Sequence, residues 1–156
     1  MRKMVIVVVT SILLVGCNSS DNGASPNDGD DAQVRLNGND GKEALNVSIG
    51  ADLKVDMPKG YSLYPGVMVI TKSNVDQGDS TALVLVMSSK DSPEKLASFY
   101  RKQAEAAGVE FSMENTSGGA QTLMGKGPDG TVFALSVIAD GSGTTAQLTV
   151  GVAKDS

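Results

Sequence analysis

The residues that come closest in type and spacing to a catalytic motif are Ser92 and Lys95, in the segment SPEK. An S-x-x-K spacing at the start of a helix places a serine hydroxyl one turn from a lysine amine, which can activate the serine for acyl transfer. That chemistry also needs a Lys-Thr-Gly segment elsewhere in the chain, and the sequence contains none. We therefore interpret Ser92 as a helix cap and Lys95 as a solvated side chain.

Histidine is absent from the 156 residues, and with it the side chain most often used for proton transfer near neutral pH. Its absence excludes Ser–His–Asp and Cys–His catalysis and His-ligated zinc. The sequence therefore predicts no catalytic residue and a protein that is not an enzyme.

Acidic residues and methionines are the remaining candidates for metal ligands. DGDDAQ (28–33) and NGNDGKE (37–43) look like pieces of a calcium loop, but neither keeps the oxygen ligands, the central Gly and the distant Glu in register. Thioethers can bind Cu(I), and five lie in the expected domain: Met57, Met68, Met87, Met113 and Met124. None is near another in sequence, so we expect them to fill the core. We predict no metal and no cofactor.

Two tyrosines form the candidate interaction surface. Tyr61 and Tyr64 flank a Pro-bounded loop, PKGYSLYPG (58–66), just before the first clearly apolar strand. Tyrosine has an apolar ring and a polar tip, so such a pair can rim a binding surface or pack over the edge of a sheet. Both interpretations remain open from the sequence.

The only cysteine, Cys17, follows a short basic end and twelve almost wholly apolar residues, MVIVVVTSILLV (4–15). A twelve-residue helix spans about 18 Å, short of the roughly 30 Å hydrocarbon core, so the pattern is that of a secretory signal peptide. The segment LVGC (14–17) resembles the lipobox of bacterial lipoproteins. The resemblance implies that residues 1–16 are a signal peptide, that cleavage precedes Cys17, and that Cys17 carries the lipid anchor.

The resemblance also implies a location and partners. Asn18, rather than Asp, follows the cysteine, which in such lipoproteins implies the periplasmic face of the outer membrane. Acyl chains on Cys17 would hold the protein to the membrane, and an envelope protein is the expected partner. The net charge is −5, and −7 without Arg2 and Lys3, which argues against nucleic-acid binding.

The rest of the chain divides into a tether and one domain. Residues 17–43 are rich in Asp, Asn, Gly and Ser, which predicts a disordered tether that begins with the lipidated Cys17. Residues 44–156 are long enough for a single globular domain. Within it, residues 44–57 alternate only weakly and are left open as a further edge strand.

The domain contains one strong helix pattern, at about 92–107, where apolar residues recur on one face and Gly108 provides a stop. Six segments have strand patterns: 67–73, 81–89, 109–116, 121–126, 131–139 and 144–153. GPDG (127–130) and DGSG (140–143) are turn sequences, so the last three strands should form a meander. We predict an α+β fold, an antiparallel β-sheet of about five or six strands with the helix packed across one face.

The segments PKGYSLYPGVMV, DSPEKLASFYRKQAEAAGV and DGSGTTAQLTV together resemble small domains of bacterial envelope lipoproteins. This resemblance supports the fold more than a function. The favoured hypothesis is a non-catalytic interaction or envelope-assembly module that binds through the uncovered sheet face or an edge strand. A small-ligand or cell-wall-binding lipoprotein is the alternative, which a cavity between helix and sheet would favour.

Overall fold

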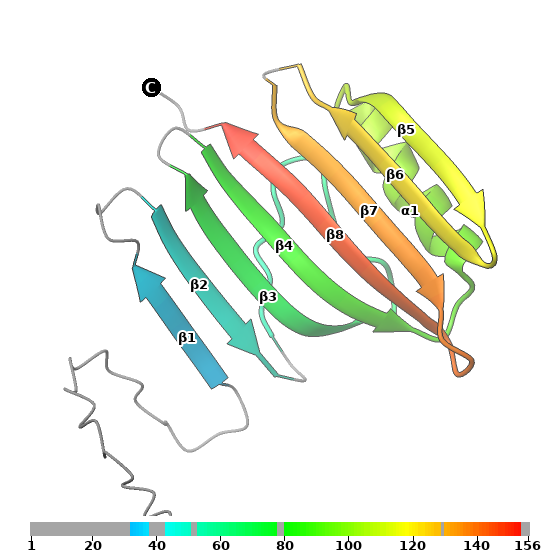
Figure 1. Cartoon of the computed structure of the whole chain (residues 1–156), viewed down its shortest axis with the longest axis horizontal. Coiled ribbons are helices and arrows are strands. Elements are labelled where there is room, and N and C mark those ends of the chain that lie inside the picture. The colour runs from blue at the N-terminus through cyan, green and yellow to red at the C-terminus, as the bar shows by residue number, and fades with distance from the viewer. Residues whose placement is uncertain (1–31, 38–42, 51–52, 78–79, 129, 154–156) are drawn as a thin grey trace, which may run out of the picture.

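The computed structural model describes residues 32–37, 43–50, 53–77, 80–128 and 130–153. They form one antiparallel sheet with an α-helix packed against one of its faces (Figure 1). The predicted α+β fold is confirmed. The predicted number of strands is wrong, because the sheet has eight strands where five or six were expected.

The elements follow the chain as two meanders separated by the helix. They are β1 (Ala32–Asn37), β2 (Glu43–Ile49), β3 (Met68–Gln77), β4 (Ser80–Ser89), α1 (Pro93–Ala106), β5 (Glu110–Ser117), β6 (Ala120–Lys126), β7 (Val132–Ala139) and β8 (Thr144–Ala153). Across the sheet the order is β1-β2-β3-β4-β8-β7-β6-β5, so β4 pairs with β8 where the two meanders meet. The predicted meander of the last three strands, β6 to β8, is confirmed.

The two additional strands lie at the N-terminal edge. β1 falls within residues 17–43, so the prediction of a disordered tether is wrong for residues 32–37. The sequence AQVRLN alternates apolar and polar residues, and β1 gains backbone hydrogen bonds by pairing with β2. The pattern was missed because this run of alternating residues is only six residues long and is flanked by Asp- and Gly-rich segments. β2 accounts for the strand that was left open at residues 44–57, but it is not an edge strand, because it pairs with both β1 and β3.

The helix begins and ends where the sequence predicts. Ser92 is the N-cap and Pro93 the first helical residue, a position where its missing N–H costs nothing. At the other end Gly108 has φ +79°, and the Val109 N–H donates to the carbonyl of Ala104 at 2.9 Å. This left-handed turn stops the helix and leads into β5.

The core lies between the sheet and two covering elements. The buried face of α1 presents Leu96, Ala97, Tyr100 and Ala104 to β6, β7 and β8. Beside α1, residues 53–67 have no helix or strand, yet five of their aliphatic side chains and both tyrosines pack on the same core. We call the covered side the inner face; its buried strand residues are Val69, Leu83, Leu85, Met87, Leu123, Phe133, Leu135, Val137, Ala146, Leu148 and Val150.

Candidate functional site

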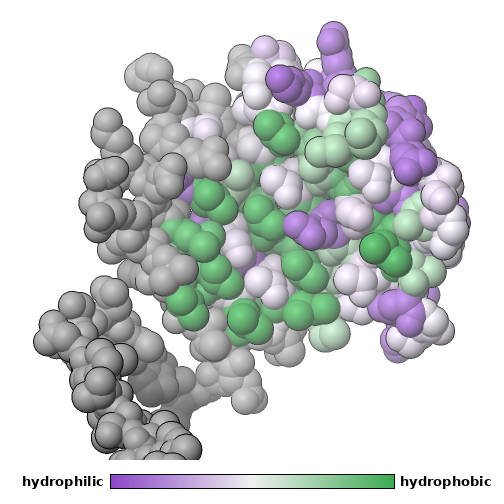
Figure 2. All heavy atoms as spheres, viewed as in Figure 1, coloured by the Kyte–Doolittle hydropathy of each residue, from purple (hydrophilic) through white to green (hydrophobic). Residues whose placement is uncertain are grey.

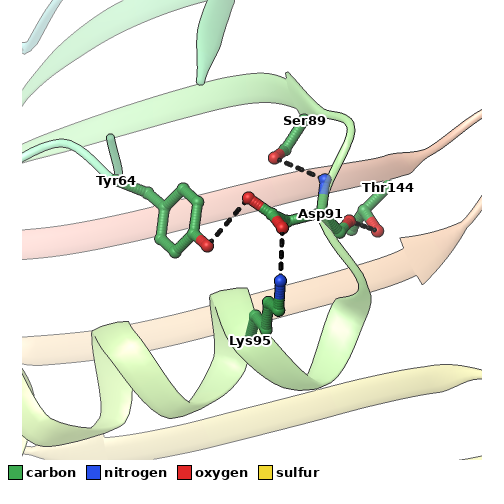
Figure 3. A network of polar contacts seen from close by, with 5 residues as sticks. All are labelled: Tyr64, Ser89, Asp91, Lys95 and Thr144. Atoms are coloured by element: carbon green, nitrogen blue, oxygen red, sulfur yellow. Dashed lines mark hydrogen bonds and ion pairs between the residues drawn. The ribbon is translucent and has the colours of Figure 1, made fainter. Parts of the chain in front are cut away.

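A polar junction ties the start of α1 to the covering segment and to the sheet (Figure 3). The Tyr64 hydroxyl donates to Asp91 Oδ2 at 3.0 Å, and Lys95 Nζ donates to Asp91 Oδ1 at 2.7 Å. The Asp91 N–H donates to Ser89 Oγ at 3.1 Å, and Thr144 Oγ1 donates to the Asp91 carbonyl at 2.6 Å. One residue thus joins residues 53–67, the end of β4, α1 and β8.

The charges in this junction stabilise one another. The hydrogen bond from Lys95, and then that from Tyr64, lowers the pKa of Asp91 below its ordinary value. The pKa of Tyr64 is raised, first by desolvation and then by its bond to the carboxylate. Lys95 is therefore an ion-pair partner rather than a base for the S-x-x-K serine. Ser92 occupies the predicted N-cap position, where its carbonyl accepts from the Lys95 and Leu96 N–H groups, but its side chain makes no capping hydrogen bond.

The two tyrosines that form the candidate interaction surface are both half-buried and pack on the core. The Tyr61 ring stacks on Phe133 with centroids 6.1 Å apart, and the Tyr64 ring meets Phe99 edge to face at 5.1 Å. The Tyr64 N–H donates to the Tyr100 hydroxyl at 3.1 Å. They hold the covering segment against the sheet, and a role in binding stays a prediction. Cys17, the predicted lipidation residue, lies outside the described residues.

A polar groove runs between α1 and the β5–β6 hairpin. Its volume is about 220 Å³, below the roughly 300–1,000 Å³ of typical ligand pockets. Arg101 reaches across it with Nη1 2.7 Å and Nη2 3.1 Å from the two carboxylate oxygens of Glu114, and with Nε 2.9 Å from Glu105. Because two carboxylates already neutralise this guanidinium, the groove does not offer a free positive charge to an anionic ligand.

The other side of the sheet, which we call the outer face, carries a row of exposed apolar side chains. Those between 38% and 52% exposed are Val34, Ile49, Met68, Ile70, Met113, Met124, Val132 and Ile138. α1 and residues 53–67 lie behind the sheet in the view of Figure 1, so Figure 2 shows this face, with hydrophobic residues gathered over its left and centre. Such an extended apolar surface is typical of an interaction site.

Methionine contributes to this face against expectation. The prediction that the methionines fill the core holds for Met87, which is fully buried, and for Met57, which packs on the core. It is wrong for Met68, Met113 and Met124, each at least 40% exposed. The reason is strand register: Met113 and Met124 lie directly opposite each other on β5 and β6, on the side away from Leu123.

A shallow apolar hollow lies at one end of the outer face. Its volume is about 200 Å³, and it is lined by Ile49 and Gly50 with Met68, Val69 and Ile70. The register of β3 against β4 shifts between Val69 and Thr71, so Ile70 is the additional residue of a β-bulge.

The outer face is nearly free of charge. Among the strand side chains that the structure describes, its charged residues are Glu110 and Lys126, which lie opposite each other at one end of β5 and β6. Lys72 and Asp76 on β3 share the inner side, where Lys72 Nζ donates to the carbonyl of Lys54 at 3.2 Å. In β2 and β3 the apolar side is thus the outer one, the reverse of β6 to β8.

The sequence did not predict that the apolar side chains of β2 and β3 lie on the outer face, and these side chains form part of the candidate binding surface. The alternation in LNVSI (45–49) is visible as a pattern, with apolar residues at every second place. Its direction relative to the core depends on the pairing of Val47 with Ser73 and of Ser73 with Val84, which is fixed only in the folded sheet.

The described residues hold no cluster of three or more Cys, Asp or Glu side chains that would suit a metal ion. Nor does this part of the chain include a helix that is both long and apolar enough to cross a bilayer. A protein-family model described as START domain-like matches residues 67–150, from just before β3 into β8, which is more than half of the chain. No curated protein and no solved structure matches this chain.

Proposed function

The chain belongs to the START domain-like family. Within this family assignment, we propose that the protein is a membrane-anchored periplasmic lipoprotein. Its domain would be a non-catalytic interaction or envelope-assembly module. The outer face of the sheet is the binding surface. The observation that carries this proposal is the set of exposed apolar side chains on β1 to β3 and β5 to β7, on a nearly uncharged face of a domain whose inner face is already covered.

The anchor belongs to the same proposal. The LVGC segment supports lipidation of Cys17 after removal of residues 1–16. Acyl chains stabilise membrane attachment by about 0.8 kcal/mol for each buried methylene, so the lipid rather than surface charge determines the location. The periplasmic face of the outer membrane is the proposed site, since Asn18 rather than Asp follows the cysteine.

Binding of a small ligand is the second candidate, because START domain-like proteins often bind small ligands. The polar groove beside Arg101 is where such a ligand would contact this domain. Two observations favour the interaction module instead. Leu96, Tyr100 and Ala104 are fully buried where α1 meets the sheet, and the groove is smaller than typical ligand pockets.

Cross-linking in intact cells that express the full chain tests the proposal. Neighbours of the wild-type protein are compared by mass spectrometry with those of Cys17→Ala, which cannot be lipidated. We expect the wild type to be found in the membrane fraction with a reproducible envelope protein, another copy of the chain included. The Cys17→Ala form should leave the membrane fraction and lose any neighbour that stays in the envelope, whereas a second copy of the chain would leave with it. Membrane attachment without Cys17, or no protein neighbour at all, would contradict the proposal.

A further inference from the structure

We propose that the partner of the outer face is a second copy of this chain, so that the domain forms a two-fold symmetric dimer with its sheets face to face. This inference rests on the proposed function, since it names the protein that the interaction surface binds.

The size of the face is the first argument. Eight strands at a spacing of about 4.8 Å, with a mean of about eight residues at 3.3 Å each, give a surface of roughly 900 Å². A stable protein interface buries about 800 Å² on each partner. One copy of the sheet therefore offers enough area for a dimer without help from another element, and two sheets pack face to face at about 10 Å.

The charge is the second argument. Once residues 1–16 with Arg2 and Lys3 are removed, each chain carries a net charge of −7, so two copies repel each other in most orientations. The described outer-face side chains bring only Glu110 and Lys126, whose charges cancel. This is the surface on which two copies meet without like-charge repulsion. A bilayer with anionic headgroups would instead favour a face rich in Lys and Arg.

The middle of the face is the third argument. β8 has four strands on one side and three on the other, and it carries outward polar residues, among them Gln147 and Thr149. An amide and a hydroxyl are each both donor and acceptor, so a row of them can bond to the same row of another copy. A two-fold axis near β8 brings the two rows together, with the apolar side chains of both copies around them.

Site-directed cross-linking of the full chain in cells tests the dimer. Cysteine is introduced at one outward position at a time, as Met68→Cys, Gln147→Cys or Ile138→Cys, and cells are treated with a bis-maleimide. Cys17, the chain's only other cysteine, is blocked in the lipidated protein. We expect a product of twice the monomer mass from at least one outer-face variant. The matched control, Ala106→Cys on the exposed end of α1, should give none.

Sedimentation of the detergent-extracted full chain supplies the second measurement. The wild type should sediment as a dimer, and the double variant Ile49→Glu, Met68→Glu as a monomer, since four carboxylates would have to be buried. Both side chains are about half exposed, so an unchanged circular dichroism spectrum should show that the monomer is folded. Ala106→Glu is the control and should remain dimeric.

The two proposals fail separately. A monomeric wild type whose outer-face cysteines cross-link to a different envelope protein would overturn the dimer but leave the interaction module standing. Outer-face cysteines that react with no protein, and that are shielded from maleimide only in membranes, would point to a lipid surface and would overturn both.

Discussion

At the scale of single residues, Tyr100 shows how one polar atom is satisfied inside an apolar layer. Its side chain is fully buried, and burial raises its pKa. Its hydroxyl accepts the Tyr64 N–H at 3.1 Å and donates to Met87 Sδ at 3.4 Å. The ring therefore packs like any core aromatic while its oxygen fixes the backbone of the covering segment.

Tyr100→Phe should keep the ring and remove that acceptor. The Tyr64 N–H would then be left without its partner in a partly buried place, so we expect the free energy of unfolding to fall by about 1–2 kcal/mol. Urea denaturation gives the value. Tyr61→Phe is the matched control, because Tyr61 packs mainly through its stacked ring, and it should change little. Equal losses in the two variants would contradict the role given to the Tyr100 hydroxyl.

Residue types were easier to interpret from the sequence than residue environments. Ser92 at the N-cap position and Lys95 as a mainly exposed side chain follow from local patterns, and both placements are found. The exposure of Met68, Met113 and Met124 could not be predicted from the sequence, because hydrophobicity alone places methionine in a core. Only the strand register determines which methionines face the solvent.

At the scale of elements, the β5–β6 hairpin depends on a close approach of two backbones. A Cβ atom added at Gly125 would lie 2.5 Å from the carbonyl oxygen of Glu110 and 2.7 Å from Val109 Cγ1. The pairing of β5 with β6 shifts register between Phe111 and Met113, directly beside this contact. Glycine is required at this place by space rather than by an unusual backbone angle.

Gly125→Ala should therefore push β5 away from β6 and lower the free energy of unfolding by about 1–3 kcal/mol, the usual cost of overpacking. Amide hydrogen exchange should become faster in β5 than in α1. Gly66→Ala is the control: Gly66 has φ +80° and no atom within 4 Å of an added Cβ, so it tests backbone strain without crowding. Unchanged exchange in β5 would refute this account.

The elements themselves were largely predictable because their signals are local. The helix has a cap, a proline and a glycine stop, and the turns GPDG and DGSG separate strands with clear alternation. β1 and β2 were missed or left open because their pairing partners, not their own composition, make them strands. The outward direction of the apolar side of β2 could not be predicted for the same reason.

At the scale of the whole molecule, acid should weaken the fold through two carboxylates whose hydrogen bonds favour their charged form, Asp91 and Asp140. Asp91 connects α1, β8 and the covering segment. Asp140 accepts from Thr145 Oγ1 at 2.8 Å and from Ser142, which lowers its pKa. A carboxyl whose pKa is lower in the folded state stabilises the fold above its ordinary value of 3.8, and this contribution disappears as the pH falls through the lowered value.

The urea midpoint should accordingly stay level from neutral pH to about 5, and then fall as the pH is lowered below 4. The double variant Asp91→Asn, Asp140→Asn should be less stable than the wild type at neutral pH and lose less of its stability between pH 5 and pH 2. Glu110→Gln, which removes a single exposed carboxylate, is the control and should keep the steep fall. Parallel curves for the wild type and the double variant would refute this explanation.

The pairing of β4 with β8 has a consequence for the order in which the chain can fold. It pairs Ser80 with Ala153, whereas every other pairing in the sheet joins strands that are consecutive in the sequence, so β4 and β8 make the least local contact in the sheet. Contacts of this kind form slowly. A chain exported from its N-terminus would present Cys17 long before β8 emerged, so the proposed lipidation would attach the protein to the membrane before the domain could close.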